Sequence, residues 1–454
     1  MGLYRRFYQL LRLLQPREWL SLRYARELAR NQWLSPEELQ NISWQKLKKL
    51  LEHAYTNVPF YHERFMQMGI TPADIRTPED FHHIPTLNKD DIRLHEDALI
   101  ARNYDKNRMH HDTTSGSTGV PIGIYHDHHY VPMENAAFLR LRRWFDVEPG
   151  DKIVWVWGRR DDIPPDTWLK RLLTFVKRER WFNAFRVSDE DMQRLAVMLV
   201  DWQPDCLAGY ATSLYFFARY VSSHHITGIE PKAVETTAGM LWPHERKTIE
   251  ETFGCKVFDR YGSHETGHIA AECDHHRMHI SSDVCHVEVM ARGQPAAEGE
   301  VGELVVTPLY NYGMPLIRYR VGDVGAWDSQ PCPCGRGLPV LRELVGRTNS
   351  IITLPSGRYF YGGIFLTILE NILEIRQFRV HQPTRDKLEI TLAKGEGFSQ
   401  EIVDVVRKRT VELLANEPVT VSIVVTDEIL PTASGKYLVT TSDVPLSFEG
   451  GLVM

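Results

Sequence analysis

Strand-like apolar runs alternate with helical patterns through the middle of this 454-residue chain. Residues 153–157 and 256–259 are short runs rich in β-branched and aromatic side chains, which is typical of buried strands. Residues 189–201 and 243–252 instead carry apolar side chains at helical spacing. This alternation constrains the fold strongly, because each helix must cover the sheet whose strands it connects. The sequence therefore predicts an α/β fold for the central part of the chain.

The residue patterns on either side of this central part are different. Up to about residue 100 the patterns are helical, with Ser35 as an N-cap and Pro36 at the first helical position. After Arg347 a fresh unit of about a hundred residues begins, which is a viable domain size. In it we expect strands at residues 378–380, 387–392 and 419–425, a helix at residues 400–415, and then an exposed tail. We predict one domain over residues 1–347, including the helical segment of about 1–100, and a second over residues 348–454.

Charge and cysteine content exclude several classes of protein. The net charge of −6 argues against a general nucleic-acid binder, which is usually basic. No apolar run approaches the roughly 20 residues that a membrane-spanning helix needs. Six cysteines in so long a chain do not indicate a disulfide scaffold, so we expect a reducing compartment and a cytoplasmic location.

The N-terminus carries a basic amphipathic pattern. Its apolar residues near helical spacing are Leu3, Tyr4, Phe7, Leu10, Leu11 and Leu14, and its interleaved arginines are Arg5, Arg6, Arg12 and Arg17. Amphipathic helices usually turn their apolar face to a core, so we favour a helix docked on its own domain or on a partner. Peripheral contact with an anionic membrane surface stays open as the alternative.

A hydroxyl-rich glycine segment at residues 113–121 carries the strongest chemical signal. Its sequence, Thr-Thr-Ser-Gly-Ser-Thr-Gly-Val-Pro, holds no apolar residue until Val120. Glycine lets the backbone approach a ligand closely, and consecutive N–H groups together with hydroxyls bind phosphate oxygens. Because a strand-like run resumes at Ile122, we interpret the segment as a polyphosphate cradle rather than a flexible linker. It is not a Walker A loop, since no Gly-Lys-Ser/Thr follows.

Three further positions place a chemically capable side chain beside a glycine. In the Tyr-Gly-Ser-His-Glu sequence of residues 261–265, the tyrosine can stack on a base and the glutamate offers an oxygen ligand for Mg²⁺. Asp323 suits ribose hydroxyls, and Lys436 presents a cation for developing negative charge. Each also has an ordinary interpretation: a glutamate that faces water, an Asx-turn and a solvated surface lysine.

The order of these motifs resembles a known superfamily. Along the chain come the hydroxyl-rich loop, Tyr-Gly-x-x-Glu at 261–265, Tyr-Arg-x-Gly-Asp at 319–323, Gly-Arg at 346–347 and Gly-Lys at 435–436. This order resembles the adenylate-forming superfamily of acyl-CoA synthetases, peptide-synthetase adenylation domains and luciferases. Residues 53–61, 81–90 and 334–336 resemble more closely its phenylacetate-CoA ligase branch and CapK-type proteins of capsular polysaccharide biosynthesis. The combined order is much more specific than any single motif.

The resemblance implies a fold and a set of roles. A large α/β domain of mixed sheets and helices would precede a small, mobile α+β domain that rotates about residues 348–349. The ATP-binding residues would be Thr114, Ser115, Ser117, Thr118, Gly119, Gly239, Tyr261, Gly262, Ser263, Asp323 and Arg347. The loop would hold the β- and γ-phosphates, Gly239 and Tyr261 would flank adenine, and Asp323 would bind the ribose. Glu265 would ligate Mg²⁺, and Lys436 would bridge the substrate carboxylate and the α-phosphate.

The reaction that the resemblance implies has two steps. ATP and a carboxylate give an acyl-adenylate and pyrophosphate, and a thiol, with CoA as the leading candidate, then takes the acyl group. The product could serve surface polysaccharide or secondary metabolite biosynthesis. Two alternatives stay open: a nucleotidyltransferase that places AMP on a hydroxyl, as a deazaflavin-coenzyme adenylylating relative does, and a non-catalytic module of a polysaccharide assembly. The sequence leaves open the carboxylate, the acceptor and the oligomeric state, monomer or homodimer.

Three positions depart from the pattern of the superfamily. Ile122 stands where many members have a lysine, Asn349 where an aspartate commonly marks the hinge, and Met240 where relatives often carry an acid. These departures do not remove adenylation, but they put CoA transfer in doubt.

Cysteines and histidines in the second half of the chain could hold a metal. Cys273, His279, Cys332 and Cys334 together supply three sulfurs and one imidazole, a set that suits tetrahedral Zn²⁺. Some relatives in the phenylacetate branch use such a site structurally. The spacing is loose, so His275 or His276 could replace His279, and reduced cysteines without metal are the alternative. We expect the remaining cysteines to be core residues: Cys206, Cys255 and Cys285.

Overall fold

The structure divides into two compact units. The computed structural model describes residues 2–113, 122–158, 167–184, 188–369, 372, 374–415, 417–430 and 439–446. The first unit comprises Met1–Glu288, Val305–Val321 and Asp328–Arg342. The second comprises Val289–Leu304, Gly322–Trp327 and Glu343–Met454. The two units are described separately below.

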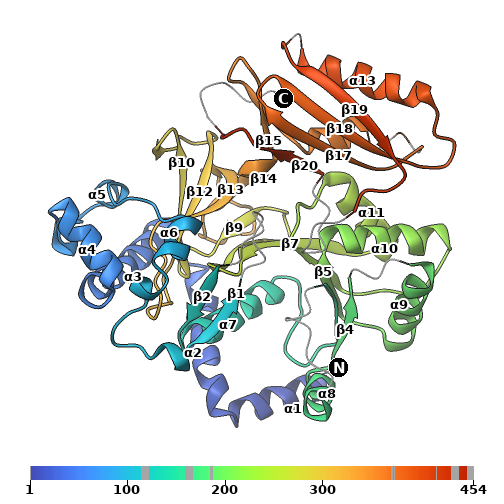
Figure 1. Cartoon of the computed structure of the whole chain (residues 1–454). Helices are drawn as coiled ribbons and strands as arrows, with labels where there is room; N and C mark the ends of the chain where they lie inside the picture. The colour runs from blue at the N-terminus through green and yellow to red at the C-terminus, as the bar shows by residue number, and fades with distance from the viewer. Residues whose placement is uncertain are drawn as a thin grey trace. The chain divides into compact units, whose positions relative to one another are not determined.

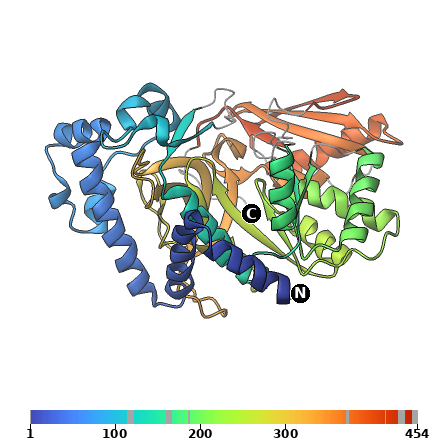
Figure 2. The same ribbon diagram turned by 90° about the horizontal axis from the view of Figure 1, so that it is seen from below.

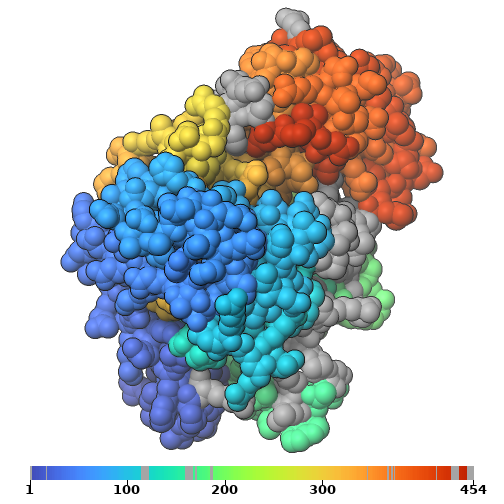
Figure 3. Space-filling view, turned by 60° about the vertical axis from the view of Figure 1, so that its left-hand side comes forward, coloured from blue at the N-terminus to red at the C-terminus, as the bar shows by residue number. Residues whose placement is uncertain are grey.

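Helices make up the start of the first unit, as the sequence patterns predicted (Figure 1). They are α1 (Gly2–Leu13), α2 (Pro16–Asn31), α3 (Pro36–Asn57), α4 (Pro59–Met68), α5 (Pro78–His82) and α6 (Lys89–Leu94), with 3-10 turns at Pro72–Asp74, Asp97–Leu99 and Lys106–Arg108. Ser35 caps α3 as predicted: its hydroxyl accepts from the Glu38 N–H at 3.2 Å, and the Glu38 carboxylate accepts from the Ser35 N–H at 2.8 Å. In Figure 3 the blue atoms of these helices form one continuous surface.

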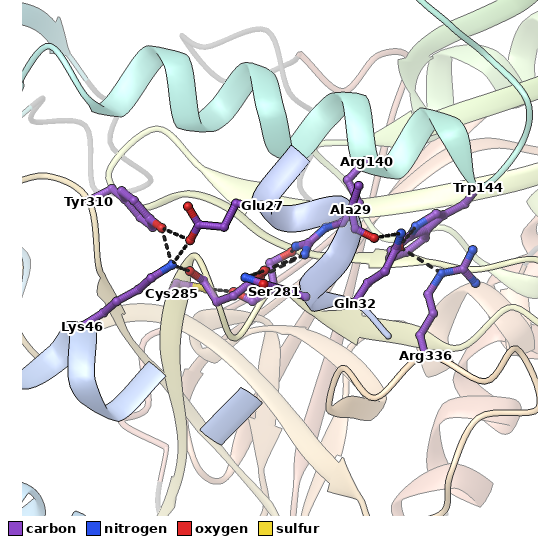
Figure 4. A network of polar contacts seen from close by, with 12 residues as sticks. Glu27, Ala29, Gln32, Lys46, Arg140, Trp144, Ser281, Cys285, Tyr310 and Arg336 are labelled. Atoms are coloured by element: carbon purple, nitrogen blue, oxygen red, sulfur yellow. Dashed lines mark hydrogen bonds and ion pairs between the residues drawn. The ribbon is translucent and has the colours of Figure 1, made fainter. Parts of the chain in front are cut away.

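A buried polar network joins α2 and α3 to helix α7 (Tyr130–Arg143) and to the turn before strand β10 (Cys285–Ala291) (Figure 4). Arg140 donates to both carboxylate oxygens of Asp283 at 3.0 Å, and Asn31 donates to the same carboxylate at 3.1 Å. Lys46 donates to the Asp283 carbonyl at 2.9 Å and contacts Glu27 at 2.8 Å. A buried charge is tolerated when it is paired and hydrogen-bonded, so this network holds the N-terminal helices in one position.

A twelve-stranded mixed sheet follows, in the strand order β11-β10-β12-β13-β14-β9-β8-β7-β6-β5-β3-β4. Its strands are β3 (Ile153–Trp157), β4 (Glu179–Asn183), β5 (Cys206–Tyr210), β6 (Ala233–Thr237), β7 (Lys256–Ser263), β8 (Gly267–Glu272), β9 (Met278–Ile280), β10, β11 (Gln294–Pro295), β12 (Val301–Pro308), β13 (Tyr319–Asp328) and β14 (Val340–Arg347). Strands β4, β3, β5, β6 and β7 pair in parallel, and β8 runs antiparallel to β7. The predicted α/β fold is confirmed.

Helices cover both faces of the parallel strands in the first unit. Leu207 of β5 packs into a core with Leu199 and Phe217 from α9 (Asp189–Trp202) and α10 (Ala211–Ser223), joined by α11 (Pro243–Phe253). Its neighbour Cys206 faces the opposite core, which Leu141 of α7 closes. Neighbouring strand residues point to opposite faces, so a strand covered on both sides is apolar throughout. Cys206 and Cys285 are buried and Cys255 is half-buried, as the sequence predicted for core residues.

The second unit holds a smaller α+β arrangement. Strands β15 (Ile351–Thr353) and β16 (Tyr359–Tyr361) form a hairpin, preceded by a 3-10 turn at Thr348–Ser350. A four-stranded sheet has the order β19-β18-β17-β20, with β17 (Ile375–Thr384), β18 (Lys387–Lys394), β19 (Thr420–Thr426) and β20 (Thr440–Ser442). Helices α12 (Ile364–Leu369) and α13 (Gln400–Leu414) share its core. The predicted strands and helix of this region are all present.

One prediction about exposure is wrong, and the predicted docking of the N-terminal helix is confirmed with its apolar face turned the other way. The tail after residue 425 is not wholly exposed, because β20 pairs in parallel with β17 and buries Thr440 and Ser442. Polar strand residues give no apolar alternation, so the pattern missed this strand.

Helix α1 is docked on the first unit, but Leu3, Phe7 and Leu10 face solvent rather than a core. No helix in the described ranges combines the length and apolarity that crossing a bilayer requires.

Candidate functional site

The hydroxyl-rich segment joins two paired strands of the first unit. Strand β1 (His110–Thr113) pairs with β2 (Gly123–His126), and the last paired residues are Thr113 and Gly123. The predicted strand after the segment is therefore confirmed, and the two ends of the segment start from neighbouring backbone positions. The predicted phosphate ligands themselves lie outside the described residues: Thr114, Ser115, Ser117, Thr118 and Gly119.

The Tyr-Gly-x-x-Glu motif runs from the end of β7 into the turn before β8, beside this hairpin. His264 Nδ1 lies 3.0 Å from Asp112 Oδ2, one residue before the end of β1. Within the turn, Ser263 Oγ accepts from the Thr266 N–H at 3.1 Å and lies 2.9 Å from the Thr266 hydroxyl. The structure therefore brings the base of the hydroxyl-rich segment and the 261–265 motif together, although they are far apart in sequence.

Two glycines of this turn are required by space. A Cβ at Gly262 would collide with the Gly267 carbonyl oxygen, whatever side chain it carried. Gly267 has a φ of +72°, and a Cβ there would collide with the Glu134 carboxylate. Both carboxylate oxygens of Glu134 accept from the His268 N–H at 3.0 Å. Helix α7 thus fixes the start of β8 through Glu134, and burial raises the pKa of that carboxyl to about 7.

Glu265 is buried and already has a cationic neighbour. Lys89 Nζ, at the start of α6, lies 3.4 Å from Glu265 Oε1, and the Tyr319 hydroxyl donates to the same oxygen at 3.3 Å. The backbone of Leu87 bonds to Arg318 and Arg320 at 2.9 and 2.8 Å, which holds the segment before α6 against the start of β13. An adjacent cation favours the ionised carboxylate. The sequence did not identify Lys89 as a partner of Glu265.

Of the two predicted adenine-flanking residues, one follows strand β6 and the other lies on the neighbouring strand β7. Gly239 follows the carboxyl end of β6, after Ala238 with a φ of +63°, and is exposed. A Cβ on it would meet nothing within 4 Å among the described residues. Tyr261 lies on β7, the neighbour of β6, and is buried. Ligands of open α/β sheets bind beyond the carboxyl ends of parallel strands, which is where Gly239 lies.

In the second unit, Asp323 and Arg347 are paired. Arg347 Nε lies 2.9 Å from Asp323 Oδ1, and the aspartate side chain is largely buried. Gly322, just before Asp323, has a φ of +80°, a conformation that suits glycine. These two predicted nucleotide ligands are therefore close to each other within their own unit. Lys436, the predicted catalytic lysine, lies outside the described residues.

Cys273, His279, Cys332 and Cys334 meet in the first unit, with their ligand atoms all within 4.8 Å of one another. Cys273 Sγ lies 3.6 Å from Cys332 Sγ, and Cys334 Sγ lies 3.3 Å from His279 Nε2. A tetrahedral zinc site with Zn–S bonds of about 2.3 Å requires sulfurs about 3.8 Å apart. The four side chains therefore have almost the separation that a tetrahedral ion would impose.

The surroundings of His279 suit metal binding. Its Nδ1 lies 3.0 Å from the Leu338 carbonyl, an arrangement that leaves Nε2 for the cluster. Burial lowers the pKa of His279 to about 4, so the ring is neutral, as a ligand must be. His275 and His276 lie near Asp274 and Arg246 instead. Of the three histidines that the sequence left open, His279 is the one in the cluster.

Comparison with curated proteins gives phenylacetate-coenzyme A ligases and Protein CapK as relatives. No protein-family model matches the chain. It is 26% identical to Protein CapK of Staphylococcus aureus over 327 residues, which cover 69% of this chain and 68% of CapK. It is 26% identical to phenylacetate-coenzyme A ligase of Thermus thermophilus over 389 residues, 81% of this chain and 84% of the relative. The corresponding Escherichia coli ligase is 28% identical over 304 residues, 64% of this chain and 67% of that protein.

Solved structures share the fold. A 2-hydroxyisobutyryl-CoA ligase in the postadenylation state has a TM-score of 0.73 and 20% identity, covering 91% of both chains. The amide bond synthetase McbA from Marinactinospora thermotolerans has a TM-score of 0.53 and 17% identity, covering 73% of this chain and 67% of McbA. The fold and the curated relatives define an adenylate-forming ligase. Within that class, the predicted resemblance to the phenylacetate-CoA ligase branch and to CapK is confirmed.

Proposed function

We propose that this chain activates a small-molecule carboxylate with ATP as an acyl-adenylate and then transfers the acyl group to CoA. The observation that carries the proposal is the contact between the hairpin and the turn: the base of the hydroxyl-rich segment lies against the motif that holds Glu265. A phosphate-binding loop and a metal-binding carboxylate must lie together for chemistry at a triphosphate. The relatives named CoA ligases support the thiol acceptor.

Glu265 is the residue that we assign to Mg²⁺. It is a buried carboxylate whose Oε1 lies 3.4 Å from Lys89 Nζ, so it already pairs with a cation at the position where Mg²⁺ would bind. Mg²⁺ is commonly held by one or two carboxylates together with substrate phosphates. When bound, the ion would neutralise charge on the departing pyrophosphate. The hydroxyl-rich segment from Thr114 to Gly119 would orient the β- and γ-phosphates beside it.

Residues of the second unit would complete the reaction. Asp323, whose Oδ1 lies 2.9 Å from Arg347 Nε, would accept hydrogen bonds from the ribose hydroxyls. Lys436 would bridge the substrate carboxylate and the α-phosphate, where charge develops during adenylyl transfer. We propose a boundary between residues 347 and 348, with rotation of the 348–454 domain about Thr348 and Asn349 between the two half-reactions.

We also propose that the cluster of three cysteines and His279 holds a structural Zn²⁺. Its four ligand atoms leave no coordination position for substrate in a tetrahedral site, which is typical of structural rather than catalytic zinc. The ion would join the β8–β9 hairpin to the loop before β14. This proposal is independent of the reaction.

The decisive experiment is pyrophosphate release on a panel of carboxylates, with and without CoA. We expect release that depends on ATP and on one class of carboxylate, and thioester formation when CoA is added. Lys436→Ala should remove most of this activity, whereas Lys387→Ala in the same unit should retain it. No release with any carboxylate would overturn the proposal. A stable AMP adduct on a hydroxyl compound, seen by mass spectrometry without dependence on CoA, would favour the nucleotidyltransferase instead.

Several finer expectations stay predictions. They concern peripheral membrane contact through the N-terminal helix, a monomeric or homodimeric state, a cytoplasmic location, and service to surface polysaccharide or secondary metabolite biosynthesis. The relatives include CapK, which is the observation that motivates the last of these.

A further inference from the structure

Helix α1 is attached to the first unit by its polar residues. Arg5 donates from Nε and a terminal nitrogen to the two carboxylate oxygens of buried Asp151, at 2.6 and 2.5 Å. The Tyr4 hydroxyl donates to the Val176 carbonyl at 2.7 Å. A bidentate arginine–carboxylate pair is strong and directional, so it fixes which face of the helix points inward.

The outward face of α1 is apolar. Leu3, Phe7, Leu10 and Leu14 are spaced four, three and four residues apart, so they form one stripe along the helix and the turn after it. Leu3 is 85% exposed, Phe7 52% and Leu14 77%. In a helix that serves its own domain, this stripe would be buried. The structure places it on the outside of the first unit, where α1 lies at the periphery (Figure 2).

Helix α8 (Trp168–Lys177) repeats the arrangement beside α1. Trp168, Leu172 and Phe175 are spaced four and three residues apart, and Trp168 and Phe175 are 77% and 78% exposed. The Tyr4–Val176 hydrogen bond joins the two helices, which lie next to each other near the N-terminus in Figure 1. A groove along α1 is lined by Leu3, Tyr4, Arg6, Phe7 and Leu10, and by Arg178 just after the end of α8. We call α1, Leu14 and α8 together the α1–α8 surface.

Basic residues accompany the apolar stripes. Residues 2–19 carry Arg5, Arg6, Arg12 and Arg17 against Glu18, and residues 167–180 carry Lys170, Arg171, Lys177, Arg178 and Arg180 against Glu179. The first segment is therefore net positive by three charges and the second by four, in a chain whose net charge is −6. Exposed apolar side chains and net positive charge therefore occur in the same two segments of a chain that is acidic as a whole.

We propose that the α1–α8 surface docks on an anionic lipid bilayer. Exposed leucine, phenylalanine and tryptophan side chains would enter the boundary between headgroups and acyl chains, and the exposed basic residues Arg6, Arg171 and Lys177 would contact the anionic headgroups. A second copy of the chain would present the same positive charge, so a symmetric contact through this surface would be opposed by like-charge repulsion. The proposal extends the predicted membrane contact of α1 to a second helix and does not rest on the proposed reaction.

Vesicle co-sedimentation of the full chain tests the proposal. We expect the protein to sediment with vesicles of phosphatidylcholine and phosphatidylglycerol, to stay in solution with phosphatidylcholine alone, and to be released by salt. The double variant Phe7→Ser and Leu10→Ser should bind roughly tenfold more weakly or worse. Arg171→Gln and Lys177→Gln should each weaken binding roughly fivefold. Val411→Ser is the matched control, because Val411 is a 54% exposed apolar residue on α13.

Two results would overturn the proposal. One is equal sedimentation with neutral and anionic vesicles, or none with either, by a protein whose circular dichroism is that of a folded chain. The other is a dimer in sedimentation velocity that the double variant converts to a monomer, since the surface would then join two copies. Pyrophosphate release by the variants is a separate readout, which the proposal expects to be unchanged.

Discussion

Two candidate metal-binding regions of the first unit are built in opposite ways. The Cys273–His279–Cys332–Cys334 cluster brings four ligand atoms within 4.8 Å of one another. The turn around Glu265 offers one predicted ligand, whose oxygen contacts Lys89 and Tyr319. The cluster supplies all four ligands of a tetrahedral site, whereas Glu265 needs substrate phosphates to complete a coordination shell. Metal at the first region should therefore affect stability, and metal at the second should affect chemistry.

The largest expected effect is that of Glu265→Gln on adenylation. The substitution keeps the shape of the side chain but removes its charge, so we expect pyrophosphate formation to fall roughly a hundredfold or more. Zinc content and thermal midpoint should stay near wild type, because the cluster is untouched. Glu251→Gln, an exposed glutamate on α11, is the matched control. A loss smaller than about threefold would contradict the assignment of Glu265 to the reaction.

Removal of a cluster ligand should have the complementary effect. In Cys332→Ser we expect bound zinc, measured by elemental analysis, to fall well below one ion per chain. The loss should destabilise the protein by roughly 3–5 kcal/mol. Activity per folded molecule should change little. Cys255→Ser removes a half-buried thiol outside the cluster and should keep the zinc. A wild-type protein purified without zinc, and unaffected by chelators, would show that the cluster is a set of reduced thiols.

A smaller effect tests whether Mg²⁺ must displace Lys89 from Glu265. Lys89 competes with Mg²⁺ for Glu265 Oε1, so Lys89→Met should lower the half-saturating Mg²⁺ concentration roughly threefold. Steady-state pyrophosphate release against Mg²⁺ measures this, with Lys247→Met on α11 as the control. An unchanged or higher half-saturating Mg²⁺ concentration would mean that Lys89 does not compete with Mg²⁺ for Glu265 and acts on the substrate instead.

The final effect concerns a pair of carboxyl groups between the two regions, Asp259 and Glu272. Asp259 lies on β7 near Tyr261, and its N–H donates to Glu272 at 2.9 Å, just before Cys273. Burial, and then the charge of Glu272, raise the pKa of Asp259 from 3.8 to about 8. The folded protein thus holds this proton more tightly than the unfolded chain does. Its contribution to stability is full below about pH 4 and is lost as the pH rises toward 8.

Thermal unfolding across this pH range checks the sign. The wild-type midpoint should fall with rising pH, apart from effects shared by both proteins, whereas Asp259→Asn should lack that component. Parallel curves for the two proteins would show that Asp259 is ionised in the folded state.

Features with local signals were predictable from the sequence. The capping box at Ser35, the strand at residues 153–157 and the helix from Asp189 follow from spacing and side-chain type within a few residues. The order of the motifs indicated the superfamily, because several weak local patterns in a fixed order are jointly specific. The predicted roles of the site residues stay predictions for the same reason: motif order assigns them and geometry has yet to test them.

Features that depend on distant contacts were not predictable. Lys89 and Glu265 are separated by 176 positions, and no local pattern around either residue announces the pair. The choice of His279 over His275 and His276 depends on where β9 places each ring. The outward apolar face of α1 follows from the Arg5–Asp151 pair, which outweighed the usual tendency of such a stripe to turn inward.

The tight turn around Gly262 and Gly267 has a consequence for how related chains are compared. A side chain at Gly262 would collide with the backbone, and one at Gly267 would collide with Glu134. Neither collision depends on the role of Glu265. Glycine is therefore required at these two positions by the packing of the turn, independently of any nucleotide chemistry. A descendant that had abandoned nucleotide chemistry would still keep both glycines for as long as it kept the turn. Finding both glycines in a related chain would therefore indicate that the turn is shared. Finding a glutamate at the position of Glu265 would indicate that the reaction is shared as well.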